Sequence, residues 1–259
     1  MNVVSKQRKR DIQIMRESIE SNGRSDSMGV PKKNWRYEDI KWHVKPITPL
    51  HEDTFRAFFE SDYKSLAITG QAGTGKTLIG TYLALNELLR KDSPIDTFII
   101  VRSIVQTRDM GFLPGDLDEK MEPYEAPYRD IFHKIFERPT AYNHMKNSKN
   151  GGAVVFVPTS FVRGVTWDNS IILLDETQNM TMHEIDSVLT RVGENSRVIM
   201  VGDREGQDDL KSKREVSGFD RAFEIAKTMG EFSTFEYGDA ECVRSGFVRS
   251  WGIAKRQFQ

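Results

Sequence analysis

Cysteine is almost absent from this 259-residue chain, since Cys242 is the only one. A lone cysteine excludes an intramolecular disulfide framework and leaves a reducing, cytoplasmic environment as the expectation. Long apolar runs are lacking as well, because no stretch approaches the ~18 residues of a membrane-spanning helix. The first ten residues are too polar for a signal peptide. We therefore expect no membrane partner.

An excess of charge of one sign is also missing. Lys and Arg number 37 against 38 Asp and Glu, so the formal net charge is −1. Any anionic partner must then be held by a local patch of charge and not by the overall field. The five histidines are scattered without the spacing of metal ligands. With 38% hydrophobic residues, the chain has enough for the core of one large α/β domain or two small ones.

Residues 1–30 read as a flexible polar and basic segment, and residues 31–259 as one domain. The segment carries four clustered cations, Lys6, Arg8, Lys9 and Arg10, before a Ser- and Gly-rich stretch typical of a linker. The cluster is either a solvated tail or a contact to nucleic-acid phosphates or to a neighbouring subunit.

The domain contains an eight-residue phosphate-binding motif, G-x-x-x-x-G-K-[ST]. Its residues are Gly70, Gln71, Ala72, Gly73, Thr74, Gly75, Lys76 and Thr77. An apolar strand at 65–69 precedes the motif and a helical apolar pattern at 78–90 follows it, a context that favours a phosphate loop over an ordinary glycine turn. We expect Lys76 to reach the β- and γ-phosphates of a nucleotide and Thr77 to ligate Mg²⁺.

Further apolar strands alternate with helical patterns along the chain, which favours a parallel α/β sheet. The expected strands are 97–101, 153–157, 170–174, 197–201 and 231–237, and the expected helices are 127–138, 182–192 and 240–255, with a loop at 143–152. Open parallel sheets bind ligands at the carboxyl ends of their strands, so residues that follow these strands are candidate site residues.

Two such residues are Asp175 and Glu176, which follow the apolar strand at 170–174 in the pattern of a Walker B motif. Asp175 would hold Mg²⁺, and Glu176 would polarise the water that attacks the γ-phosphate. Taken alone, the pair could equally be solvated acids after a core strand. Combined with the phosphate loop, it predicts an NTPase.

The residues around this pair also carry a family resemblance. Residues 175–181, Asp-Glu-Thr-Gln-Asn-Met-Thr, resemble the D-E-A-Q-N-T-T block of PhoH-like ATPases, which are single-core relatives of superfamily-one helicases. Residues 111–117, Gly-Phe-Leu-Pro-Gly-Asp-Leu, and residues 161–166, similar to F-M-R-G-R-T, agree in content and order. Residues 239–245 resemble the family's closing segment, and the whole resemblance covers residues 45–255.

The resemblance implies a three-layer α/β P-loop NTPase (RecA-like) with a mainly parallel central sheet. It implies ATP or another NTP and Mg²⁺ as cofactors, single-stranded RNA or DNA as a partner, and a homo-oligomer, with a hexamer as one form. Such proteins occur in bacteria and their phages, which implies a cytoplasmic location, in the host if the protein is phage-encoded.

The resemblance also assigns residues. Besides Lys76 and Glu176, it gives catalytic roles to Gln207 as γ-phosphate sensor and to Arg244, expected just inside the final helix, as γ-phosphate arginine. Arg102 and Arg163 become candidates for nucleic acid or γ-phosphate, with a structural role as the alternative, and Gln178 would link nucleotide state to nucleic-acid contacts. Because a single core leaves the γ-phosphate half open, Arg244 would reach a neighbouring subunit's nucleotide. The alternatives are that it acts on the nucleotide of its own subunit or that it is a structural arginine.

Two departures from the family pattern leave roles open. Residues 202–207 are one residue longer than the family's G-D-P-x-Q and lack its proline, so the sensor role of Gln207 stays open. His51, Glu52 and Asp53 stand where relatives place a glutamine that hydrogen-bonds adenine, so a preference for ATP over other NTPs is not assumed.

Three functions fit these observations. The first is an Mg²⁺-dependent NTPase coupled to single-stranded nucleic acid. The second is a nucleotide-dependent switch or scaffold with slow hydrolysis. The third is a P-loop phosphotransferase, against which the Asp175–Glu176 pair speaks.

Overall fold

The computed structural model describes residues 35–60, 65–104, 117–146, 152–162, 164–204, 216–244 and 246–257. The expected N-terminal segment and its basic cluster lie outside these residues, as do Arg163, Gln207 and most of the block at 111–117.

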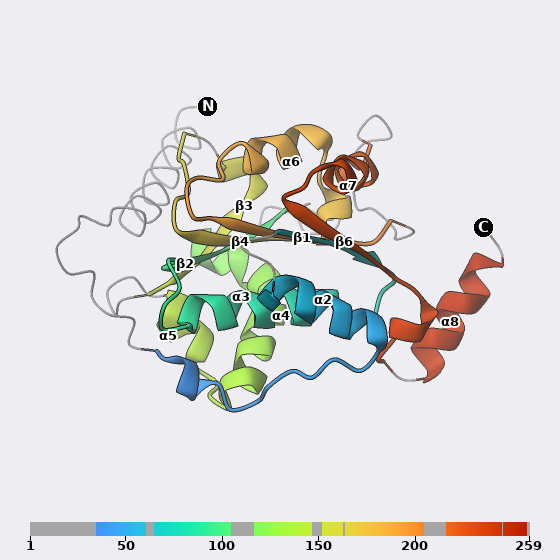
Figure 1. The fold of residues 1–259 in the computed structure, drawn as a ribbon, viewed down its shortest axis with the longest axis horizontal. Coiled ribbons are helices and arrows are strands. Elements are labelled where there is room, and N and C mark those ends of the chain that lie inside the picture. Colours follow the sequence, from blue (N-terminus) through green and yellow to red (C-terminus); the bar gives the residue numbers. More distant parts are fainter. Residues whose placement is uncertain are drawn as a thin grey trace.

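A six-stranded sheet forms the centre of the molecule, with the strand order β3-β2-β4-β5-β1-β6 and parallel pairing throughout (Figure 1). The strands are β1 (Ser65–Gly70), β2 (Thr97–Arg102), β3 (Val154–Pro158), β4 (Ser170–Asp175), β5 (Arg197–Gly202) and β6 (Phe232–Tyr237). Each was expected from its short apolar, β-branched run. The predicted three-layer α/β fold with a parallel sheet is confirmed.

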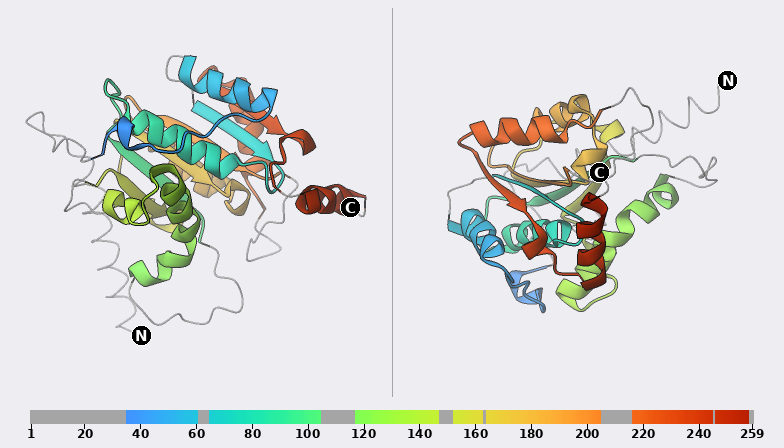
Figure 2. Two further views of the ribbon diagram at one scale, coloured as in Figure 1. Left: turned by 90° about the horizontal axis from the view of Figure 1, so that it is seen from below. Right: turned by 90° about the vertical axis from the view of Figure 1, so that its right-hand side faces the viewer.

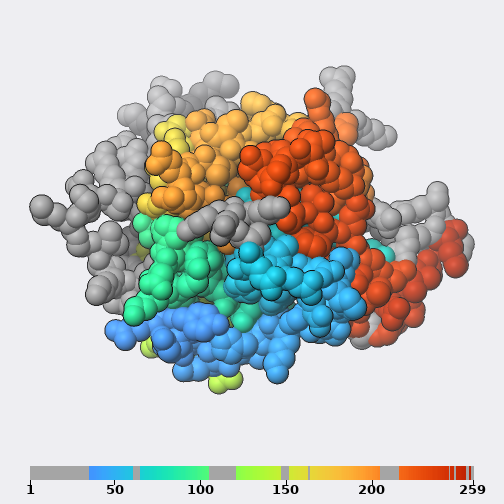
Figure 3. Space-filling view, in the orientation of Figure 1, coloured from blue at the N-terminus to red at the C-terminus, as the bar shows by residue number. Residues whose placement is uncertain are grey.

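Helices cover both faces of this sheet (Figure 1, Figure 2). One face carries α2 (Pro49–Glu60), α3 (Lys76–Leu89), α4 (Leu117–Phe136) and α5 (Ala141–Lys146), and the other carries α6 (Met182–Leu189) and α7 (Phe219–Thr228). Short 3-10 helices lie at η1 (Tyr37–Asp39), η3 (Thr159–Phe161), η4 (Thr177–Asn179) and η5 (Asp239–Glu241). The last helix, α8 (Gly246–Arg256), projects from the molecule beyond the carboxyl end of β6, as the space-filling view also shows (Figure 3).

The core is divided by the sheet because side chains of a strand point alternately to its two faces. In β4, Ile171 and Leu173 join the cluster under α3 and α4, whereas Ile172 and Leu174 join the cluster under α6 and α7. All four are fully buried, which explains why β4 reads as an unbroken apolar run. The same burial leaves only the strand ends free to carry chemistry.

Two sequence predictions about helices were wrong at their boundaries. The helix expected at 127–138 begins at Leu117, since Pro123 and Pro127 lie inside α4 although proline usually marks a first turn. The loop expected at 143–152 is helical up to Lys146, where α5 ends. Both errors come from inferring helix boundaries from local prolines and polar residues, whereas tertiary packing determines where these helices begin and end.

The final helix was also predicted wrongly. The expected helix at 240–255 is two elements, η5 and α8, so Arg244 lies in the connection before α8 and not inside a helix. The connection is extended because the backbone N–H of Val243 donates to the carbonyl of Gly73, at 3.0 Å. A continuous helix would use that N–H within itself.

Within the described residues, no helix has both the length and the apolar character needed to cross a membrane.

Candidate nucleotide site

The phosphate loop owes its curl to three glycines. Gly73 and Gly75 have φ values of +91° and +79°, a region where side chains other than glycine are strained. Gly70 is required for a different reason, since a Cβ built there would lie 2.6 Å from Cβ of Tyr237 on β6. Because α3 begins at Lys76, the loop presents backbone N–H groups and the helix N-terminus to one point.

Lys76 holds the loop in its curled form. Its Nζ donates to the carbonyl oxygens of Gly70 and Gln71, the latter at 2.8 Å, and lies 3.4 Å from Oγ1 of Thr74. Thr74 Oγ1 in turn donates to the Gln71 carbonyl at 2.8 Å. The ammonium group therefore lies in the hollow of the loop, where phosphate oxygens could replace these carbonyls.

Burial lowers the pKa of Lys76 from its ordinary value, and the acids of the site oppose that effect. Asp203, Glu176 and Asp175 each favour the charged form, while the guanidinium of Arg244 favours the neutral form. Residues from β4, β5 and the connection before α8 thus surround the loop lysine.

Asp175 ends β4 directly beside α3. Its Oδ1 accepts a hydrogen bond from Thr77 Oγ1 at 2.9 Å, although the two residues are far apart in sequence. A hydroxyl and a carboxylate are the hard oxygen donors that Mg²⁺ prefers. Both residues assigned to the metal are therefore brought together, and they fit Mg²⁺.

Tyr128 of α4 is a site residue that the sequence analysis missed. Its hydroxyl donates to Oδ2 of Asp175 at 2.6 Å, and both side chains are buried. Burial raises the pKa of Tyr128 well above its usual range, and the neighbouring Asp175 adds to the effect. The available signal was helical spacing: Tyr128 belongs to the inward stripe with Phe132 and Ile135, and a buried tyrosine needs a polar partner.

Glu176 follows in a left-handed conformation, with φ +51°. Its Oε2 accepts from Nε2 of Gln178 at 2.6 Å, and Oε1 of Gln178 accepts the backbone N–H of Asp203 at 3.0 Å. Burial raises the pKa of Glu176, with repulsion from Asp175 second, against the lowering effect of Arg102 and the Gln178 hydrogen bond. Gln178 therefore joins the Walker B glutamate to the end of β5.

Arg102 is the second strand-end residue beside the acid pair. It pairs in register with Asp175 where β2 and β4 run together. Burial acts against its charge, but Tyr128, Asp175 and Glu176 outweigh this and raise the pKa of Arg102. The guanidinium therefore faces the metal-binding end of the site.

Arg244 lies on the other side of the loop, in the same chain. A Cβ built on Gly73 would lie 3.1 Å from both Cγ and Cδ of Arg244, so the aliphatic part of the arginine packs against the glycine. The side chain is otherwise exposed. The remaining assigned residues, Arg163 and Gln207, lie outside the described residues.

His51 of α2 occupies the position where relatives place a base-binding glutamine. It is buried, packs edge-on against the Tyr237 ring at 4.8 Å between centroids, and among the described residues its Nε2 has no hydrogen-bond partner. Burial lowers the pKa of His51, against Glu241 and a backbone group of Thr74. Glu52 and Asp53 are exposed, so of the three residues only His51 faces the loop region.

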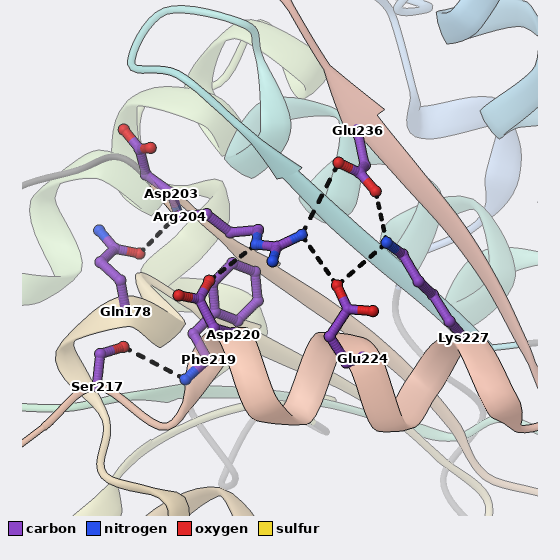
Figure 4. A network of polar contacts seen from close by, with 9 residues as sticks. All are labelled: Gln178, Asp203, Arg204, Ser217, Phe219, Asp220, Glu224, Lys227 and Glu236. Carbon is purple, nitrogen blue, oxygen red and sulfur yellow. Dashed lines mark hydrogen bonds and ion pairs between the residues drawn. The ribbon is translucent and has the colours of Figure 1, made fainter. Parts of the chain in front are cut away.

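A cleft of about 570 Å³ lies beside the loop at the ends of β1, β5 and β6. Arg204, which follows β5, extends along this cleft and pairs with Asp220 and Glu224 of α7 and Glu236 of β6 (Figure 4). Gln71 of the loop reaches the same region, where its Nε2 donates to Asp239 at 2.7 Å. The cleft is predominantly acidic, so phosphates are expected on the Lys76 side of the loop and not here.

The sequence of the chain matches a family of known proteins. A family model described as PhoH-like protein matches residues 43–254. The chain belongs to the PhoH-like family. The resemblance inferred from its motifs is thereby confirmed, and the match includes every described residue that we place at the loop and at the Walker B pair.

Relatives of this PhoH-like chain occur in several bacteria. It is 36% identical over 208 residues to Protein PhoH of Escherichia coli strain K12, covering 80% of the chain and 57% of that protein. It is 35% identical over 180 residues to the PhoH-like protein of Bacillus subtilis strain 168, covering 69% and 54%. Protein PhoH2 of the same strain is 30% identical over 189 residues, covering 72% and 42%. This PhoH-like chain thus spans about half the length of the relatives it matches.

Proposed function

We propose that the chain binds ATP or another NTP with Mg²⁺ and hydrolyses it, as a helicase-like ATPase coupled to single-stranded RNA or DNA. The observation that carries this proposal is the convergence of four side chains from two elements. Lys76 and Thr77 open α3, and Asp175 and Glu176 close β4, with Thr77 and Asp175 in direct contact. Cation, metal ligands and base are the groups that phosphate-bond cleavage requires.

Each group has a definite task in this proposal. Lys76 would exchange the carbonyls of Gly70 and Gln71 for β- and γ-phosphate oxygens. Thr77 and Asp175 would hold Mg²⁺, which neutralises charge on those oxygens when bound. Glu176, oriented by Gln178, would accept the proton of the attacking water.

The same contacts suggest how nucleotide state would be communicated. Gln178 is bonded to Glu176 on one side and to the backbone of Asp203 on the other. The next residue, Arg204, is paired with α7 and β6 (Figure 4). A change at Glu176 would therefore displace the end of β5 and strain these ion pairs, which links the γ-phosphate to a distant face of the sheet.

We also propose that the active form is a homo-oligomer, with a hexameric ring as one form. The described sheet carries one phosphate loop, and in two-core helicases a second core covers the γ-phosphate. A second copy of this chain would supply that cover.

The test is NTP hydrolysis with and without RNA, single-stranded DNA and duplex, at two salt concentrations. We expect stimulation by single strands that weakens at higher salt, because backbone contacts release counterions. Turnover that stays low with every polymer would contradict coupling and favour the switch. Phosphoryl transfer to an acceptor other than water would favour the phosphotransferase.

A further inference from the structure

Helix α8 presents two aromatic rings to solvent. Phe247 is 77% exposed and Trp251 is 66% exposed, and these are the two most exposed aromatic side chains of the described residues. They lie four residues apart, on one face of the helix and about 6 Å apart along its axis. Two exposed rings on one face of a helix form an apolar patch, which makes this face a candidate interaction surface.

The charge of the surrounding segment specifies an anionic occupant. Residues 242–259 contain four cations, Arg244, Arg249, Lys255 and Arg256, and no Asp or Glu, although acids and bases balance over the whole chain. Arg249 is exposed on α8 itself. The basic segment and the acidic cleft at the ends of β5 and β6 both adjoin the phosphate loop. Opposite charges are therefore separated on two sides of the same loop.

Helix α8 is attached to the phosphate loop by close contacts. A Cβ built on Gly252 would lie 2.8 Å from Oε1 of Gln71. The helix therefore approaches the loop at a glycine, where a side chain would collide with Gln71. Just before the helix, the N–H of Val243 donates to the Gly73 carbonyl and Arg244 packs on the same glycine. Phe247 and Trp251 remain exposed although α8 contacts the loop. These contacts couple the position of α8 to the conformation of the loop.

We propose that the outer face of α8 is a stacking platform for single-stranded nucleic acid. Bases stack on Phe247 and Trp251, and Arg249 contacts the phosphates. Flat exposed rings within an acid-free basic segment match a partner that has aromatic bases on an anionic backbone, and stacking of this kind accepts any base. The inference rests on the proposed coupling to nucleic acid and names the surface that performs it.

Affinity is measured by fluorescence anisotropy with short labelled oligodeoxythymidylate and oligouridylate. Phe247→Ala and Trp251→Ala should each weaken binding by roughly 5- to 100-fold, the range of one lost stacking contact. Phe59→Ala, which removes a half-exposed ring from α2, is the matched control and should bind as the wild type does. Arg249→Ala should reduce the slope of log affinity against log salt concentration by about one, which corresponds to the loss of one phosphate contact. Thermal unfolding checks that each variant is folded.

A second readout separates stacking from general damage. Trp251 is 66% exposed, against 40% for Trp42 and 4% for Trp167, so an oligonucleotide that stacks on α8 should quench mainly the intrinsic fluorescence of Trp251. Trp251→Phe keeps a ring and should keep the affinity while losing the quenching. Trp251→Ala should lose both.

The outcomes separate this inference from the proposed function. If the wild type binds oligonucleotide and the α8 variants bind equally well, the platform is wrong and the coupling stands. If the wild type hydrolyses nucleotide but binds no oligonucleotide at either salt, coupling and platform both fail. Loss of self-association or of binding to anionic vesicles in Phe247→Ala, with oligonucleotide affinity unchanged, would assign the face to a second copy or to a lipid surface and overturn the proposal.

Discussion

The hydroxyl of Tyr128 donates a hydrogen bond to Oδ2 of Asp175 at 2.6 Å, while Thr77 donates to the other carboxylate oxygen. Asp175 is thus held by one donor from α4 and one from α3. Its orientation depends on a helix that the Walker motifs do not include. Tyr128 acts here as a positioning residue for the metal-binding aspartate.

Tyr128→Phe should weaken the binding of Mg²⁺ at the nucleotide site. The variant keeps the ring and leaves a buried carboxylate oxygen without its donor, which costs on the order of 1–3 kcal/mol for a charged group. We expect the Mg²⁺ concentration for half-maximal nucleotide binding to rise about tenfold, measured by titration. Tyr82→Phe is the control, since it removes a buried hydroxyl that pairs with His43 instead. Equal Mg²⁺ dependence in the two variants would refute the positioning role.

Lys76→Ala and Glu176→Gln should separate binding from hydrolysis. The first removes the loop's cation, so both nucleotide binding and turnover should be lost. The second keeps size and polarity but removes the base, so nucleotide should bind and persist while the rate falls about 10²-fold or more. Equilibrium binding and single-turnover hydrolysis are the measurements. Near-normal turnover in Glu176→Gln would show that Glu176 is not the base that activates the attacking water.

Arg244 is expected to serve the nucleotide of its own subunit. The sequence suggested a neighbour's nucleotide as its target, but the side chain packs on Gly73 of its own loop. Arg244→Ala should reduce hydrolysis by roughly 10²-fold, the cost of one donor to developing charge. Mixed oligomers of Arg244→Ala and Lys76→Ala subunits should regain no activity, because no subunit carries both groups. Recovered activity in verified mixed oligomers would show that the arginine acts across an interface.

Gly70→Ala should destabilise the fold at the junction of β1 and β6. The added Cβ would lie 2.6 Å from Tyr237 Cβ and 2.8 Å from its carbonyl oxygen, so the strands must separate. Overpacking of this kind costs about 2 kcal/mol, a lowering of Tm on the order of 5 °C. Gly230→Ala is the control, because no atom of the part of the chain that the structure describes lies within 4 Å of a Cβ built there. Equal thermal stability of the two variants would contradict the close approach.

The strands and the phosphate loop were predictable because their signals are local. A buried parallel strand must be apolar along its whole length, as Ile171 to Leu174 are, and a curled loop favours glycine where φ is positive, as at Gly73 and Gly75. The acids that follow β4 could be placed because parallel strands end at one edge. These inferences needed no knowledge of distant contacts.

The contacts that complete the site were not predictable in this way. Tyr128 approaches Asp175 only because α4 packs across the sheet, and α4 itself runs through two prolines that sequence rules treat as helix starts. Arg244 was expected inside a helix, but it lies in a connection whose Val243 N–H donates to the carbonyl of Gly73. That hydrogen bond joins segments far apart in sequence, so the local pattern around Arg244 gave no sign of it. No local pattern encodes such pairings.

The position of β1 between β5 and β6 has a consequence for the newborn chain. Gln71 of the phosphate loop contacts Asp239, which is synthesised 168 positions later. Until β6 has been synthesised, β1 is an open edge of the sheet and β6 does not cover Gly70. The loop therefore reaches its final form only after β6 has left the ribosome, because its contacts close a long sequence separation, a slow step by its topology. A nascent chain that stalls before residue 232 would hold every residue of the motif and still lack the shape that grips phosphate.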